Sequence, residues 1–170
     1  MFFVANVDES QAACDVTKKE DLSGALAELV SFANERGNDV VIISGKVESE
    51  ISDLDEDERK LFLESLNLSS SGLARLAEQG HNILELITFF TSGPKETRAW
   101  TIRKGTAAVD AAGVIHTDFS KGFIRAEVIG YDDFVSSKGE QGAKEKGLLR
   151  LEGKAYVVED GDVMHFRFNV

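Results

Sequence analysis

The sequence is poor in cysteine and in long apolar runs, and each shortage excludes a class of protein. A single cysteine among 170 residues, Cys14, can form no disulfide within the chain and no cysteine-based metal cluster, which is typical of a reducing compartment. No stretch reaches the roughly 20 apolar residues of a membrane-spanning helix. No basic segment precedes the first apolar run, as it would in a secretory signal. We therefore expect a cytoplasmic protein without a membrane partner.

Phosphate-binding and nucleophile motifs are also missing. A P-loop needs G-x-x-x-x-G-K-[ST], because its backbone amides wrap the phosphates and its lysine reaches them. Gly45-Lys46 and Gly153-Lys154 lack both the earlier glycine and the following Ser or Thr, and neither G-x-G-x-x-G nor G-x-S-x-G occurs. These motifs therefore predict no catalytic residue.

The net negative charge of the chain comes entirely from its first half. Residues 1–85 contain 7 Lys or Arg and 18 Asp or Glu, a net charge of −11, whereas residues 86–170 contain 12 of each and are neutral. Because an acidic surface repels nucleic acid over long range, any contact with RNA must come from the second half. The shift in charge also predicts two domains, 1–85 and 86–170.

The first half has the pattern of a parallel strand–helix–strand unit. Residues 2–7 and 39–44 are continuous apolar runs, which is typical of strands buried on both faces. Between them, Thr17 and Glu20 have the spacing of a capping box, which predicts that a helix begins there. Apolar residues at helical spacing give that helix one buried face: Leu22, Leu26, Leu29, Val30 and Ala33.

From residue 86 the pattern changes to short strands. Gly93-Pro94 predicts a turn between two strands, residues 106–113 a helix ended by its last glycine, and residues 122–131 another strand. Asp160-Gly161 predicts a hairpin turn before the last strand, and the polar segment 136–147 a mobile loop or frayed helix. The second half is therefore predicted to be a small α+β sheet of the β-grasp kind.

Polar residues follow both strands of the first half. Asn6 and Glu9 end the first strand, and the segment 44–46 (Ser-Gly-Lys) ends the second. Ligands bind at the carboxyl ends of parallel strands, an asparagine amide can donate to and accept from a purine edge, and a Ser-Gly turn lets backbone amides approach closely. The pattern predicts a purine-binding edge; the alternative is that Asn6 and Glu9 merely form a turn.

The three histidines give no stronger signal. His81, His116 and His165 lie far apart in the sequence, and none has a cysteine or a second histidine nearby. His116 with Asp118 could supply two metal ligands or a base with its orienting group, but an isolated pair of this kind is more often structural. No metal site is predicted.

The segment FFTSGPKETRAWTIRKGTAAVDAAGVIHTDFSKGFIRAEV, with DGDVMHFRFNV at the end of the chain, closely resembles the YchF group of the Obg-like ATPases. The resemblance covers residues 2–170. It implies that residues 86–170 are a TGS domain, a ubiquitin-like β-grasp module, and that residues 1–85 are an α/β remnant of the family's P-loop nucleotide-binding domain without its P-loop. The chain is then expected to be a natural truncation or a piece of a longer protein.

The same resemblance implies what the strand ends do. In this family the N-K-x-D motif of GTPases takes an N-x-x-E form, here Asn6-Val7-Asp8-Glu9, and ATP is preferred to GTP. The implied base-binding residues are Asn6, Val7, Glu9, Ser44, Gly45 and Lys46. The intact family hydrolyses ATP with Mg²⁺, and because most nucleotide binding energy comes from the phosphate cradle, this chain alone is expected to bind ATP weakly and to be inactive.

The resemblance also implies a ribosome or RNA partner, reached through the TGS domain. The residues expected to make that contact are basic: Arg98, Arg103, Lys104, Lys121 and Arg125. The alternative is a TGS module that binds RNA or a protein alone and has no nucleotide role. A partial parallel sheet would also leave an exposed edge through which the chain could self-associate.

Overall fold

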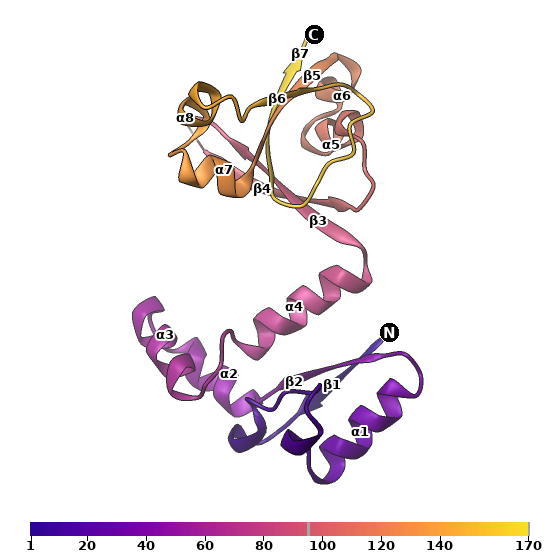
Figure 1. The fold of residues 1–170 in the computed structure, drawn as a ribbon, viewed down its shortest axis with the longest axis vertical. Coiled ribbons are helices and arrows are strands. Elements are labelled where there is room, and N and C mark those ends of the chain that lie inside the picture. The colour runs from indigo at the N-terminus through magenta and orange to yellow at the C-terminus, as the bar shows by residue number, and fades with distance from the viewer. Residues whose placement is uncertain (95, 170) are drawn as a thin grey trace. The chain divides into compact units, whose positions relative to one another are not determined.

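The chain forms two compact units, Met1–Ile83 and Leu84–Val170, each with its own core (Figure 1). The computed structural model describes residues 1–94 and 96–169. Within those residues no helix is long and apolar enough to cross a membrane. Each unit is described below by itself.

The first unit is built on two parallel strands, as the apolar runs predict. Strand β1 (Phe2–Asn6) pairs with β2 (Asp39–Ile43) in a register that sets Asn6 opposite Ile43. Helix α1 (Gly24–Asn34) packs on one face of the pair, and its buried residues join the strands in a small core. Members of that core from the helix and the strands are Ala5, Leu26, Val30 and Ile42.

The predicted capping box at the start of α1 is wrong. Thr17 is held by a local turn instead, donating from its backbone N–H and from Oγ1 to the Asp15 carboxylate at 2.9 and 2.7 Å. Helix α1 begins later, after Ser23. A capping box does occur at the start of α3 (Glu56–Ser65), where Asp55 and Glu58 bond reciprocally.

Two more helices complete the first unit, and their own side chains bind them to each other and to β2. Helix α2 (Gly45–Ser52) was not predicted. Its Glu48 accepts a hydrogen bond from the backbone N–H of Gly72 at 2.6 Å, a donor at the start of α4 (Gly72–Ile83) that has no partner within that helix. From α4, Arg75 donates to the carbonyl of Ile42 at 3.0 Å. These bonds hold α4 against β2.

The second unit is a mixed five-stranded sheet with strand order β4-β3-β7-β5-β6. Neighbouring strands are antiparallel except β3 and β7, which are parallel. The strands are β3 (Leu86–Ser92), β4 (Thr97–Arg103), β5 (Phe123–Gly130), β6 (Arg150–Glu152) and β7 (Asp162–Phe168). Helix α5 (Ala108–Ile115) buries its alanines against one face, where Phe89 is fully buried.

Two local predictions for this unit are wrong, for different reasons. The Asp160-Gly161 turn does not close a hairpin, because β6 pairs with β5 and not with β7. Asp160 instead accepts from the backbone N–H of Thr88 at 2.7 Å. Helix α5 continues through Gly113 instead of ending there. A Cβ added at Gly113 would lie only 3.3 Å from the Ser120 Cβ atom of the next short helix, α6 (Thr117–Lys121).

A buried carboxylate fixes the loop before β7. Asp162 is 2% exposed and accepts hydrogen bonds from Arg150 (3.2 Å), the Tyr156 hydroxyl (2.8 Å) and the Glu159 backbone N–H (2.9 Å). Burial of the phenol, and then its hydrogen bond to Asp162, raise the pKa of Tyr156 to about 12. Three of the roughly four lone-pair sites of the Asp162 carboxylate are therefore used inside the fold.

The face of the sheet opposite α5 is partly covered by the polar segment. That segment follows α7 (Tyr131–Ser136) and forms a turn with positive φ at Lys138 and Gly139 and then α8 (Glu140–Glu145). On the same face, Arg167 of β7 donates two hydrogen bonds to the Glu127 carboxylate of β5, at 3.1 and 3.0 Å. The hydrogen bonds from Arg167 hold the pKa of Glu127 below its usual value.

Candidate functional site

The carboxyl ends of β1 and β2 lie together, and a side chain joins them. The backbone N–H of Val7 donates to the Ile43 carbonyl at 2.8 Å, which extends the ladder by one residue. Beyond it, the Asn6 Oδ1 atom accepts from the backbone N–H of Gly45 at 3.0 Å. The structure thus brings together two segments that are 39 residues apart in the sequence.

A second bond crosses the same edge. The ammonium of Lys46 lies 2.8 Å from the Glu9 carboxylate and 3.9 Å from Glu50. The hydrogen bond to Glu9 raises the pKa of Lys46. Because the Lys46 side chain is 68% exposed, the pair is screened by solvent. It orients the two loops more than it stabilises the fold.

Ser44 and Gly45 lead directly into helix α2 instead of forming the predicted Ser-Gly turn. Ser44 is 2% exposed, precedes α2, and its buried Oγ has no hydrogen-bond partner among the described residues. An added Cβ at Gly45 would lie 3.5 Å from the Asn6 Oδ1 atom, an ordinary contact, so the fold does not require glycine there. Sequence reasoning missed α2, although Val47 and Ile51 have the spacing of a buried helical face.

Two open cavities flank the first strand end. One, of about 620 Å³, runs along Val4–Asp8 and reaches the start of α1 at Ser23 and Gly24. The other, of about 760 Å³, is lined by Asp8, Glu9 and Lys46, with residues 65–67 opposite. The loop after β1 therefore has solvent-accessible space on both sides.

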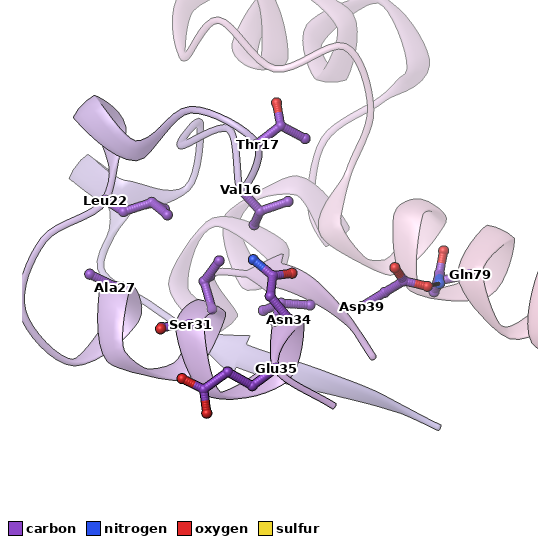
Figure 2. A pocket seen from close by; sticks show the side chains of 11 residues that line it. Val16, Thr17, Leu22, Ala27, Ser31, Asn34, Glu35, Asp39 and Gln79 are labelled. Carbon is purple, nitrogen blue, oxygen red and sulfur yellow. Dashed lines mark hydrogen bonds between the residues drawn. The ribbon is translucent and has the colours of Figure 1, made fainter. Parts of the chain in front are cut away.

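Another cavity of the first unit lies away from this edge. It measures about 830 Å³ and is enclosed by α1, the segment before it, β2 and α4 (Figure 2). Figure 2 shows Ser31, Asn34 and Asp39 around it, with Gln79 bonded to Asp39 at 2.6 Å. None of the residues predicted from the sequence to bind a base lines this cavity.

The basic residues of the second unit do not form one cluster. Arg98 and Arg103 lie on β4, an edge strand, while Arg125 lies on β5, and both β3 and β7 stand between. Arg98 stacks over the Trp100 ring at 4.3 Å. Lys104 directly follows β4, and Lys121 ends α6. The structure therefore offers separate basic positions on different strands.

His116 has a structural role. Its Nδ1 atom accepts from the backbone N–H of Asp118 at 3.2 Å, which caps α6, and lies 3.4 Å from the Asp118 carboxylate. With two possible ligands only, this pair does not make a metal site.

Among the described residues, the strand ends offer polar groups but no set of ligands for a triphosphate with its ion. Within the described part of Met1–Ile83, no group of three His, Cys, Asp or Glu side chains converges as a magnesium or zinc site would require. The sequence has no P-loop to hold phosphates. The groups available at this edge are the Asn6 amide, the Glu9–Lys46 ion pair and the backbone of the two segments that follow β1 and β2.

Comparison with known proteins gives consistent matches. A family model named YchF-GTPase_C, described as a protein of unknown function (DUF933), matches residues 86–169. The ribosome-binding ATPase YchF of Bacillus subtilis is 46% identical over 170 residues, which is 100% of this chain and 45% of that protein. The ribosome-binding ATPase YchF of Pasteurella multocida is 58% identical over 139 residues, 82% of this chain and 38% of that protein.

A solved structure agrees with these matches. The structure of the Schizosaccharomyces pombe YchF GTPase superposes with a TM-score of 0.83 at 33% identity, covering 98% of this chain and 43% of that one. The chain thus spans less than half the length of the relatives that it matches.

Proposed function

This chain belongs to the YchF family and corresponds to the C-terminal portion of its members, and from this premise we propose that its first unit supplies the base-binding side of a nucleotide site that prefers ATP to GTP. Residues 1–85 are then the last part of a P-loop nucleotide-binding domain. The relatives' names as ribosome-binding ATPases support the assignment. In the intact proteins, Mg²⁺ and the phosphates would be held by segments that this sequence does not contain.

The observation that carries the proposal is the bond between Asn6 and Gly45. It uses the Asn6 Oδ1 atom and leaves the amide NH₂, which makes no hydrogen bond to any described residue, to donate to a ligand. Purine N7 is an acceptor in both adenine and guanine. Asn6 would therefore recognise a purine, and the choice between the two bases must come from other atoms.

Two neighbouring groups favour adenine. A guanine-reading carboxylate accepts from guanine N–H groups that adenine lacks, and here Lys46 occupies one oxygen of the Glu9 carboxylate at 2.8 Å and competes with such donors. The Val7 N–H is taken by Ile43, whereas no hydrogen bond within the described residues uses the Val7 carbonyl. A free carbonyl is an acceptor, which suits the adenine amino group and opposes the guanine O6 atom.

The expected affinity is low, because the phosphates have no cradle in this chain. We expect the ¹⁵N-labelled protein, titrated with adenosine, ATP and GTP, to show amide shifts at residues 6–9 and 44–46. Dissociation constants for adenosine and ATP should both lie near about 1 mM, equivalent to about −4 kcal/mol. GTP should bind about 10-fold more weakly, since one unmatched polar group costs about 1–3 kcal/mol.

Asn6→Ala should abolish these shifts by removing the amide that bridges the loops. Asn34→Ala, at an exposed asparagine of α1, is the matched control and should leave them unchanged. Low-micromolar binding of ATP, or equal binding of adenosine and guanosine nucleotides, would contradict the proposal.

For the second unit we propose a TGS domain of the β-grasp kind that contacts ribosomal RNA. Its mixed sheet, with parallel β3 and β7 and α5 packed across one face, supports the fold assignment. The contact would use the separate basic positions: Arg98, Arg103, Lys104, Lys121 and Arg125. A cytoplasmic location follows from this partner.

Ribosome binding through these side chains should depend steeply on salt. Cosedimentation of the chain with ribosomes is expected to fall between 50 and 200 mM salt, because phosphate contacts release counterions, about 0.7–0.9 for each phosphate neutralised. Arg98→Gln and Arg125→Gln should each reduce the log–log salt slope by about 1, whereas Arg36→Gln in the first unit should not. Salt-independent cosedimentation would refute RNA contact, and none at any salt would favour a protein partner.

An alternative is that the second unit acts as a stand-alone binding module and the first unit has no nucleotide role. The separate cores of the two units favour this reading over a single continuous site. Among the described residues β1 pairs only with β2, so self-association through its other edge is also proposed. The nucleotide titration decides the first point, and NMR line widths that do not change with concentration would exclude the second.

A further inference from the structure

Three side chains that the proposed function does not use converge on the outer face of the second unit's sheet. Glu127 comes from β5, His165 from β7 and Glu140 from the first position of α8. One ligand atom from each lies within 4.8 Å of the others. The β5–β7 register sets Glu127 directly opposite His165, so two of the three are positioned by the sheet itself.

The space between these side chains has the size of a single small ion or water. A cavity of about 10 Å³ is lined by all three, together with apolar residues of the sheet and of the α7–α8 segment. A cavity of about 10–15 Å³ holds one water-sized particle. Its apolar lining residues are Ile129, Phe134, Leu149, Val163 and Met164.

Arg167 leaves Glu127 able to bind an ion. The guanidinium bonds once to each carboxylate oxygen, at 3.1 and 3.0 Å, but an ionised carboxylate has about four lone-pair sites. The Glu127 side chain is only 12% exposed, so Arg167 fixes its orientation. Carboxylates that bind metals are commonly held by such an outer partner.

We propose that Glu127, Glu140 and His165 bind one divalent transition-metal ion of the Zn²⁺ type, which ties α8 to the outer face of the sheet. One imidazole with two carboxylates suits zinc, whereas magnesium prefers oxygen ligands and water. In a tetrahedral zinc site, bonds of about 2.0–2.2 Å set neighbouring ligand atoms about 3.4 Å apart. His165 is exposed and Glu140 is partly exposed, so both can close the remaining gap by side-chain rotation.

The ion would add an anchor for α8, which also buries Ala143. Helix α8 has six residues and follows a turn with positive φ at Lys138 and Gly139. A ligand from α8 on a metal shared with β5 and β7 would link that turn to the sheet. Because the ion binds the folded form, it should also raise the thermal midpoint of this unit.

The test is metal binding by the full, untagged chain, since a histidine tag would bind the same ions. Calorimetric titration with Zn²⁺ should give one ion per chain, and millimolar Mg²⁺ should not displace it. His165→Asn and Glu140→Gln should each weaken Zn²⁺ binding by more than about 10-fold, since even outer partners of metal ligands are worth about 10–100-fold. Co²⁺ should show the absorption of a four-coordinate site, lost in both variants.

Both variants change side chains that are at least partly exposed. If one variant does not fold, the Zn²⁺ affinity of the other still tests the proposal. His116→Asn is the matched control, because His116 has one carboxylate beside it in place of two, and it should bind Zn²⁺ as the unaltered chain does. The absence of saturable Zn²⁺ binding would overturn the proposal. Binding that survives His165→Asn, or that is lost in His116→Asn, would overturn it as well.

Discussion

Asp162→Ala is expected to lower the free energy of unfolding of the second unit by about 3 kcal/mol, because removing one partner of a buried charged pair costs about 3–5 kcal/mol. Asp162 is 2% exposed and accepts from Arg150, Tyr156 and a backbone N–H. The Arg150 side chain is 43% exposed and regains water after the change, which places the loss at the lower end. Urea unfolding followed through Trp100 measures it.

Glu159→Ala is the matched control. It removes an exposed carboxylate from the same loop and keeps the backbone N–H that donates to Asp162 at 2.9 Å. Surface changes of this kind usually stay within about 0.5 kcal/mol. Equal unfolding free energies for Asp162→Ala and the unaltered chain would show that the loop before β7 does not depend on this carboxylate.

The strands could be predicted from the sequence because hydrophobic pattern alone specifies them. Apolar runs predicted β1 and β2, and their parallel pairing is confirmed. Helix starts were harder. Thr17 has the right spacing for a cap, but Asp15 two residues earlier offers a stronger local turn. A spacing rule does not weigh such competition.

The candidate base site was partly predictable for the same reason. Two parallel strands that end in polar residues must present those residues at one edge, so Asn6 and Gly45 could be paired before the structure was known. The bond between Glu9 and Lys46 could not be predicted from the sequence. The two residues are 37 positions apart in the sequence, and whether they meet depends on where α2 begins. The sequence did not predict that helix, because acidic residues separate its two buried residues, Val47 and Ile51.

The cluster of Glu127, Glu140 and His165 gives no sequence signal at all. Metal motifs are recognised by short spacings, and these residues come from three elements. Their meeting requires the β5–β7 register and the fold of the polar segment 136–147, which the sequence predicted only as a mobile loop or frayed helix. A one-residue slip of β7 would move His165 to the opposite face.

Gly142→Ala is expected to destabilise the second unit by about 3 kcal/mol, although alanine normally favours a helix. In α8 an added Cβ would meet the backbone oxygen of Ser137 far inside contact distance. Overpacking of this kind costs about 1–3 kcal/mol and occasionally more, and Ser137 is itself buried, so the turn before α8 must open. The loss should appear as faster amide exchange across 137–146.

Gly80→Ala separates this clash from the general effect of replacing glycine in a helix. Gly80 lies in α4, and an added Cβ there meets nothing within 4 Å. Alanine should therefore stabilise the first unit by up to about 1 kcal/mol, because glycine is disfavoured in helices by that amount. If both substitutions raise stability, then the tight approach of α8 to Ser137 does not hold in solution, and Glu140 would lose the constraint that places it beside the sheet.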